Sequence, residues 1–275
     1  MPIEQRANFW THWSSFGQGE SEVLLLHCTM GSLGAWRGLV ECLSDKYFFT
    51  AFDMPGHGKS ESWVDQDDFH TLTTEIAKTF LDKPMDLVGH SFGGSVALRL
   101  AMEVPEKVNS LVLIEPVIMN LAFRDEPTLK KVYDEDHRRY FEAFEAGDYE
   151  TASKEFHIHW GDGTAWEDLP DRLRALMVQK IKMIRAGDSN VYGDSYGFSK
   201  PGRLNKIKIP TLLMEGGKSH SSVVKINDAL QRRLSQTSRI LIASAGHMIP
   251  ITHPLQTATA LERFWSGLRK SCSLN

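Results

Sequence analysis

One short segment of the chain combines residue types and a spacing that suit nucleophilic catalysis. Residues 86–94 read Asp-Leu-Val-Gly-His-Ser-Phe-Gly-Gly, so Gly89 and Gly93 flank Ser91 at equal distance. A serine that attacks a carbonyl carbon must sit on a tight, strained turn, which needs nearly bare neighbours. An apolar run precedes this turn and a helical pattern follows it. The pattern predicts that Ser91 is a nucleophile at a helix start, where backbone amides favour developing negative charge.

The elements that must position this serine recur along the chain as short apolar runs followed by helical stretches. Runs rich in leucine and β-branched residues are typical of strands buried on both faces. Their alternation with helices predicts an α/β fold with a mostly parallel, doubly wound sheet. The expected strands are Glu22–His27, Tyr47–Phe52, Met85–Gly89, Ser110–Ile114, Ile209–Met214 and Arg239–Ala243. The expected helices are Leu72–Leu81, Ser95–Glu103, Val223–Leu234 and Gln256–Leu268.

This alternation breaks between Glu115 and Ile209, where roughly ninety residues pass without a convincing buried strand. An unstructured loop of that length is improbable in a compact domain, and much of the segment is helix-prone, so we expect a helical insertion. Its aromatic residues form either a small core of the insertion or, for a few of them, the wall of a substrate cavity. They include Tyr133, Tyr140, Tyr149, Tyr192, Tyr196, Trp160 and Trp166.

Composition and charge narrow the class of protein. The 275 residues are 41% hydrophobic and 24% charged, which is ordinary for a globular chain with a substantial core. The net charge of -4 leaves no positive surplus for nucleic acid or an anionic membrane. Met1–Trp13 lacks the apolar core of a signal peptide, and no apolar run approaches the roughly 20 residues of a membrane span. Three widely spaced cysteines argue against a disulfide framework, so we expect a soluble, reduced, cytoplasmic protein.

Taken together, these motifs resemble those of the α/β-hydrolase-fold superfamily, from about Glu22 to the C-terminus. Besides the Gly-x-Ser-x-Gly turn, Asp53–Ser60 is similar to the family's Asp-x-x-Gly-x-Gly-x-Ser loop, and Trp36 stands in the first helix. The resemblance implies a core domain of residues 1–116 and 207–275. It also implies a helical cap domain of residues 117–206, inserted between two strands and placed over the pocket.

The resemblance assigns a general base as well. His247, in Ala-Gly-His-Met-Ile-Pro, follows the last expected strand, so the order of serine then histidine matches the family. Its implied role is to take the Ser91 proton and return it to the leaving group. His157 and His159 alternate like a pair of metal ligands, but no third ligand stands out in the sequence. We therefore expect no metal and no cofactor.

An oxyanion hole is implied by the segment that follows the first expected strand. Residues 27–32, His-Cys-Thr-Met-Gly-Ser, resemble the family's His-Gly-x-x-Gly-Ser loop. The match implies that the amides of Thr29 and Phe92 bind the oxyanion, each worth about 3 kcal/mol to the transition state. Cys28 occupies the usual glycine position. Because no partner residue activates it, we expect a small buried side chain there rather than a nucleophile.

The acid of the triad departs from the family's pattern. In the family it usually follows the strand before the last one, in a Gly-x-x-Asp pattern, and Ser219 holds that position here. A serine does not stabilise an imidazolium as a carboxylate does. Some family members place the acid one strand earlier, where Glu115 directly follows an expected strand. Glu115 is therefore the first candidate for the acid and Glu215 is the second. The third reading is a water-bridged or vestigial site.

The sequence thus predicts an enzyme, a carboxylesterase- or lactonase-like serine hydrolase without a cofactor. It would cleave an ester, lactone or thioester bond of a small molecule through an acyl-Ser91 intermediate. Cleavage of an activated carbon–carbon bond by the same triad is one alternative. A small-molecule binding or receptor protein with weak or no turnover is another, because the usual aspartate is missing. Apolar residues of the insertion, namely Trp160, Met177, Met183 and Tyr192, favour a substrate with an apolar part.

Overall fold

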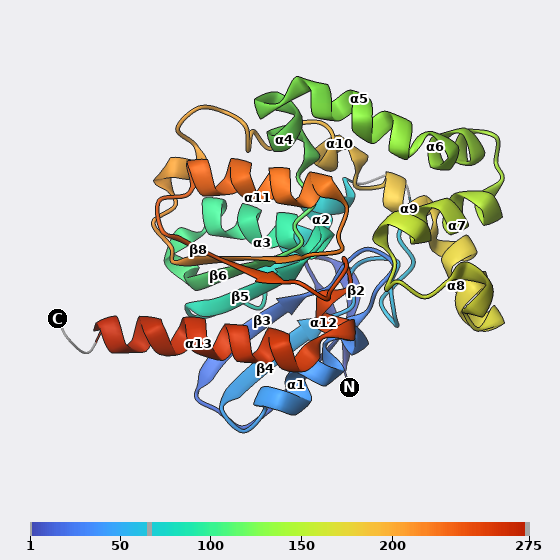
Figure 1. Cartoon of the computed structure of the whole chain (residues 1–275). Helices are drawn as coiled ribbons and strands as arrows, with labels where there is room; N and C mark the ends of the chain where they lie inside the picture. Colours follow the sequence, from blue (N-terminus) through green and yellow to red (C-terminus); the bar gives the residue numbers. More distant parts are fainter. Residues whose placement is uncertain (1, 65–67, 273–275) are drawn as a thin grey trace.

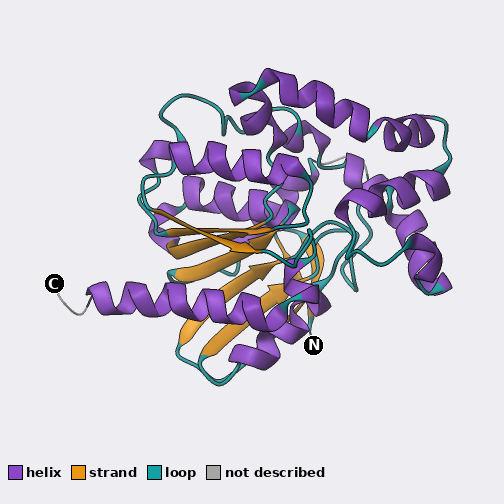
Figure 2. Cartoon of the chain, viewed as in Figure 1, coloured by secondary structure: helices purple, strands orange, loops and turns teal. Residues whose placement is uncertain are grey.

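An eight-stranded sheet with helices on both faces forms the centre of the computed structural model, which describes residues 2–64 and 68–272 (Figures 1 and 2). The strand order is β1-β2-β4-β3-β5-β6-β7-β8, and every neighbouring pair from β4 to β8 is parallel. These strands are β3 Ser21–Leu26, β4 Tyr47–Phe52, β5 Met85–His90, β6 Val108–Ile114, β7 Thr211–Gly216 and β8 Thr237–Ile242. The prediction of a mostly parallel sheet is confirmed, and each of the six expected strands is present within two residues of its expected bounds.

Two N-terminal strands were not among the expected ones. β1 Ile3–Arg6 and β2 Phe9–Phe16 form a hairpin that pairs antiparallel with β4. Its turn residues Ala7 and Asn8 have φ of 48° and 63°, a left-handed pair that matches the right-handed twist of a hairpin. Asn8 is the only turn signal, and no glycine accompanies it, so the turn is weakly marked in the sequence.

Helices cover the two faces of this sheet with separate hydrophobic clusters. On one face α1 Arg37–Leu43 and α13 Pro254–Cys272 pack with the short α12 Ile249–Thr252. On the other face lie α2 Phe69–Lys78, α3 Phe92–Glu103 and α11 Ser221–Arg233 (Figure 1). Trp36, Phe49 and Trp265 belong to the first cluster, and Phe69 and Phe92 to the second. Covering both faces explains why the central strands read as continuous apolar runs.

The segment between β6 and β7 is helical. Figure 1 shows α6 to α9 beyond one end of the sheet, while α4 packs against α11. The helices are α4 Met119–Asp125, α5 Pro127–Asp136, α6 Arg138–Glu145, α7 Tyr149–Trp160, α8 Asp171–Lys180, α9 Lys182–Arg185 and α10 Asp188–Val191. The division into a core of 1–116 and 207–275 and a cap of 117–206 stays a prediction. Among the described residues, no helix has both the length and the apolar character to cross a bilayer.

The turn between β5 and α3 sets the backbone at Ser91. This residue has φ 55° and ψ -117°, a conformation that side-chain-bearing residues rarely adopt. A Cβ at Gly89 would lie 2.3 Å from the carbonyl oxygen of Gly93, and a Cβ at Gly93 would lie 2.1 Å from that of Leu26. The two glycines are thus required because backbone approaches backbone on both sides of the serine.

Replacing Gly93 by alanine should therefore destabilise the whole fold. The new Cβ meets rigid backbone rather than a flexible side chain, so we expect Gly93→Ala to lower the free energy of unfolding by about 3 kcal/mol or more. Gly267→Ala is the matched control, because a Cβ there meets nothing within 4 Å on an exposed turn of α13. It should leave stability unchanged or raise it by up to about 1 kcal/mol. Urea denaturation measures both, and equal stabilities of the two variants would contradict the close-approach argument.

Candidate active site

Ser91 and His247 lie in hydrogen-bond contact, although 156 positions separate them. The Ser91 hydroxyl is 2.9 Å from Nε2 of His247, which stands in the loop between β8 and α12. Both side chains are buried. β5 and β8 end at the same edge of the parallel sheet, and this brings the two loops together. The distance is suitable for transfer of the serine proton to the imidazole.

Glu115 provides the carboxylate that reaches this histidine. Its Oε2 accepts a hydrogen bond from Nδ1 of His247 at 3.0 Å, and its Oε1 accepts one from the Gly216 amide at 2.6 Å. The side chain is fully buried, and the residue follows β6 with φ 51°. Because the carboxylate holds the proton on Nδ1, the lone pair of Nε2 faces the Ser91 hydroxyl.

Glu215, the second candidate, has other hydrogen-bond partners. Its carboxylate accepts hydrogen bonds from Arg239 at 2.7 and 3.1 Å and from the Asn227 amide at 2.8 Å. It thus forms an ion pair with Arg239 of β8 and a hydrogen bond with Asn227 of α11. Among the described residues, no hydrogen bond joins it to His247. Ser219 has a buried hydroxyl that finds no hydrogen-bond partner in the described part of the chain. Of the two candidate acids, the structure brings only Glu115 to the histidine.

The backbone of His247 is held by a neighbour of the nucleophile. Nε2 of His90 donates to the carbonyl oxygen of His247 at 2.8 Å. Burial, followed by the nearby His247, lowers the pKa of His90 to about 3, so this ring stays neutral near pH 7. The sequence marks His90 only as part of the turn. Its hydrogen bond to the His247 carbonyl forms only when the two loops come together in the folded chain.

Thr29 and Phe92 line the same cavity as Ser91. Phe92 begins α3, so its amide is one of the free donors at a helix start. Thr29 lies in a turn closed by the Gly31 amide, which donates to the Cys28 carbonyl at 3.0 Å. The next residue, Met30, has φ 62°, and its amide donates to Nε2 of His57 at 3.0 Å. Both residues thus lie on the wall of the cavity that contains Ser91, and their role as an oxyanion hole stays a prediction.

The loop Asp53–Ser60 is hydrogen-bonded to the turn at Thr29. Asp53 accepts hydrogen bonds from the Leu33 amide at 2.7 Å and the Lys59 amide at 2.9 Å. His12 adds a third contact at 2.6 Å. A Cβ at Gly58 would lie 2.0 Å from the Asp53 carboxylate, which explains the glycine in the motif. Because His57 belongs to this loop, the motif and the turn at Thr29 form one hydrogen-bonded unit.

Cys28 is the small buried side chain that the sequence predicts. It is 4% exposed, and burial raises the pKa of its thiol to about 12. A thiol with this pKa stays protonated at neutral pH and is a poor nucleophile. The departure from the family's glycine therefore changes the cavity wall without adding a reactive group.

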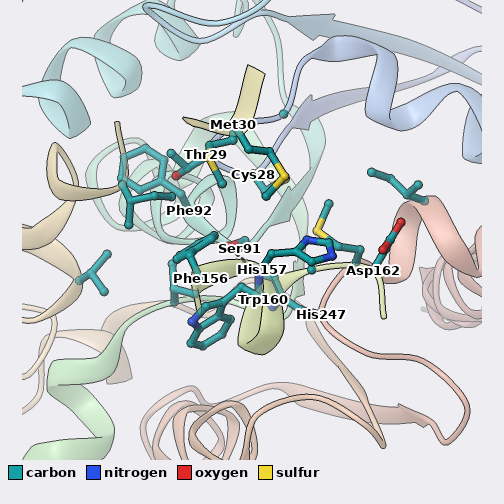
Figure 3. A pocket seen from close by; sticks show the side chains of 18 of the residues that line it. Cys28, Thr29, Met30, Ser91, Phe92, Phe156, His157, Trp160, Asp162 and His247 are labelled. Atoms are coloured by element: carbon teal, nitrogen blue, oxygen red, sulfur yellow. Dashed lines mark hydrogen bonds between the residues drawn. The ribbon is translucent and has the colours of Figure 1, made fainter. Parts of the chain in front are cut away.

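A cavity of about 320 Å³ opens next to Ser91 (Figure 3). Helices from the segment 117–206 supply much of its wall, including Trp160, Met177 and Tyr192. Trp160 stands edge-on to His247, with 4.8 Å between ring centroids. Met183, by contrast, lies outside the lining and packs against the main hydrophobic cluster.

The charged groups of the cavity wall are acidic. Asp162 and Asp188 line it, and none of the described lining residues is a lysine or arginine. Burial raises the pKa of Asp188 to about 6, although Arg185 donates to its carboxylate at 2.6 Å and opposes the shift. The cavity thus suits an apolar, uncharged ligand.

Comparison with known proteins agrees with this architecture. The family model for the alpha/beta hydrolase fold matches residues 23–254. A pimeloyl-[acyl-carrier protein] methyl ester esterase of Neisseria meningitidis is 29% identical over 255 residues, covering 90% of this chain and 93% of that protein. The protein of the same name from Nitrosomonas europaea is 25% identical, covering 91% and 98%. A thermophilic esterase from Thermogutta terrifontis superposes with a TM-score of 0.70 at 19% identity, covering 95% and 94%, and shares the fold.

Proposed function

The chain belongs to the α/β-hydrolase-fold family, and from that premise we propose that it is a serine esterase acting on small, uncharged esters. The observation that carries the proposal is the buried, hydrogen-bonded series from Ser91 through His247 to Glu115. A protein that only binds a ligand has no need of a hydroxyl, an imidazole and a carboxylate in this order. The ester-cleaving names of the relatives support the same reaction class.

The proposed reaction proceeds through an acyl-enzyme. Ser91 Oγ attacks the ester carbonyl carbon while Nε2 of His247 takes the hydroxyl proton. The oxygen that becomes negative is held by the amides of Thr29 and Phe92, at the positive end of the α3 dipole. Collapse of this intermediate breaks the carbon–oxygen bond, and His247 gives its proton to the departing alcohol. A water molecule, deprotonated by His247, then releases the acid from Ser91.

Glu115 acts in this scheme through His247. Its carboxylate keeps the proton on Nδ1, so that Nε2 is an acceptor when the substrate arrives, and it stabilises the imidazolium that follows proton transfer. The Gly216 amide occupies the other oxygen and fixes the side chain. Glutamate thus replaces the family's usual aspartate at a different strand end, with the same contact to the base.

The cavity supports the proposed substrate class. Its described lining is mostly apolar and carries two carboxylates without a lysine or arginine, so a substrate carboxylate would meet like charge. Carbon–carbon cleavage also fits less well, because the enolate it releases needs a positive group for stabilisation. We further propose that residues 117–206 act as a cap over the nucleophile, since α7, α8 and α10 contribute to the wall.

The first test asks whether Ser91 is activated. Incubation with a fluorophosphonate should add one phosphonyl group to the protein, as intact mass will show, because His247 increases the nucleophilicity of the serine. Ser91→Ala should show no adduct. An unlabelled folded protein, or equal labelling of the variant, would overturn the proposed function.

The second test compares the two glutamates. Glu115→Gln should lower kcat/KM by about 10³- to 10⁴-fold, because an amide can hold the wrong imidazole tautomer and cannot stabilise an imidazolium. Glu215→Gln, the matched control, should keep kcat within about 3-fold while weakening the contact with Arg239 and thus the stability of the fold. Circular dichroism will show that both variants are folded. Collapse of turnover in Glu215→Gln alone would assign the acid to that residue instead.

The third test measures charge selectivity. The para-nitrophenyl ester of hexanoic acid should be cleaved with a kcat/KM at least about 10-fold above that of the para-nitrophenyl half-ester of adipic acid, which has the same chain length and a terminal carboxylate. The pKa of Asp188 is about 6, so its charge is present above that pH and lost below it. The ratio of the two kcat/KM values should therefore fall as the pH drops below about 6. It should also be smaller in Asp188→Asn than in the natural chain. A preference for the half-ester would contradict the proposed substrate class.

A further inference from the structure

Three histidines that are far apart in the sequence meet beside the active site without lining its cavity. His137 joins α5 to α6, His159 stands in the last turn of α7, and His220 caps the N-terminus of α11. One ring nitrogen from each lies within 4.8 Å of the other two. The ring centroids are 4.3, 5.0 and 5.7 Å apart. His157, which the sequence pairs with His159, instead contacts the Thr164 carbonyl at 2.8 Å and lines the cavity.

Two of these rings already have the tautomer of a metal ligand. Nδ1 of His137 donates to the Tyr133 carbonyl at 3.0 Å, and Nε2 of His159 donates to the Asp136 carbonyl at 3.0 Å. Each ring therefore keeps a lone pair on its other nitrogen. A backbone carbonyl that holds one ring N–H is the usual way in which proteins orient a ligating histidine.

The carboxylate of Asp136 contacts one ring of the cluster, that of His220. Its Oδ2 lies 3.2 Å from Nε2 of His220. A histidine binds a metal in its neutral form, through the ring nitrogen that carries no proton. Three imidazoles with room for a water molecule form a donor set that suits zinc.

We propose that His137, His159 and His220 bind Zn²⁺, with a water molecule in the fourth position. Tetrahedral zinc with bonds of about 2.0–2.1 Å places its ligand atoms about 3.4 Å apart, so the cluster must contract by about 1 Å or a little more. Ligation through Nε2 of His220 requires its proton to move to Nδ1, which now accepts a hydrogen bond from the Ser222 amide at 3.2 Å. That contact is lost, and the Ser222 hydroxyl, 2.9 Å from Nδ1, accepts the new N–H instead. Ligation at His220 and His137 thus needs no net loss of a proton.

The site is coupled to the active site through Trp160. The indole N–H of this residue donates to Nε2 of His137 at 3.0 Å, and the indole itself stands edge-on to His247 and lines the cavity. Zinc takes the lone pair that now accepts this hydrogen bond. Bound metal therefore releases the indole of Trp160, which packs against His247. The metal also connects α6, α7 and α11 at one point. The expected effect is reversible inhibition.

Calorimetric titration of the chelator-treated protein with zinc chloride tests binding without reference to catalysis. We expect one Zn²⁺ per chain, and Mg²⁺ should show no binding because it prefers oxygen ligands. His159→Ala and His220→Asn should each weaken zinc binding at least about 10-fold, and asparagine keeps a good cap for α11. His253→Ala is the control, since that residue lies outside the cluster and contacts Ser244. Absence of saturable binding, or equal affinity in all three variants, would overturn the proposal.

An activity measurement tests the coupling and rests on the proposed esterase function. Zinc should reduce the rate of ester cleavage by the natural chain at least about 10-fold, and a chelator should restore it. Each variant is compared with its own rate without metal: the rates of His159→Ala and His220→Asn should be insensitive to the same zinc concentration, and that of His253→Ala should fall. Inhibition that persists in both cluster variants would place the metal elsewhere. Absence of esterase activity in the natural chain would contradict the proposed function. The metal site would then be tested by the calorimetric titration alone.

Discussion

The hydrogen bond between Glu115 Oε2 and His247 Nδ1 is the contact on which the rest of the site depends. It fixes one tautomer of the imidazole and thereby decides that Nε2 faces Ser91. Glu115 directly follows β6 and has a positive φ of 51°, just as Ser91, which directly follows β5, has a φ of 55°. Two neighbouring strand ends thus hold strained backbone, and the dense sheet beneath them keeps both in place.

Buried neutral histidines hold the loops around this contact. His27 and His57 each accept a backbone amide N–H at 3.0 Å, and His90 donates to a backbone carbonyl. Burial lowers the pKa of all three, which keeps one nitrogen of each ring as an acceptor near neutral pH. An imidazole is suited to this role because it can join one acceptor and one donor from segments that are distant in the sequence. The turn at Thr29 and the loop of His247 are therefore held by hydrogen bonds to these buried rings.

The wall of the cavity and the histidine cluster come from the same helices. α7 carries Trp160 on the side of His247 and His159 on the side of the cluster. Ser91, Glu115 and His247 stand in turns and loops at the ends of strands, whereas the helices between β6 and β7 supply much of the apolar and acidic cavity wall.

The sequence by itself determined the parts that local spacing encodes: the glycine-flanked turn at Ser91, the buried strands, the loop Asp53–Ser60 and the position of His247 after the last strand. These depend on nearest-neighbour sterics and on the period of apolar residues. Only the tertiary structure decided which glutamate meets the histidine, because that depends on which distant residues pack around each carboxylate. Glu215 points to Arg239, while Glu115, one strand nearer to Ser91, points to His247. The meeting of His137, His159 and His220 was likewise decided by packing, since three separate elements must be in place before their rings are close.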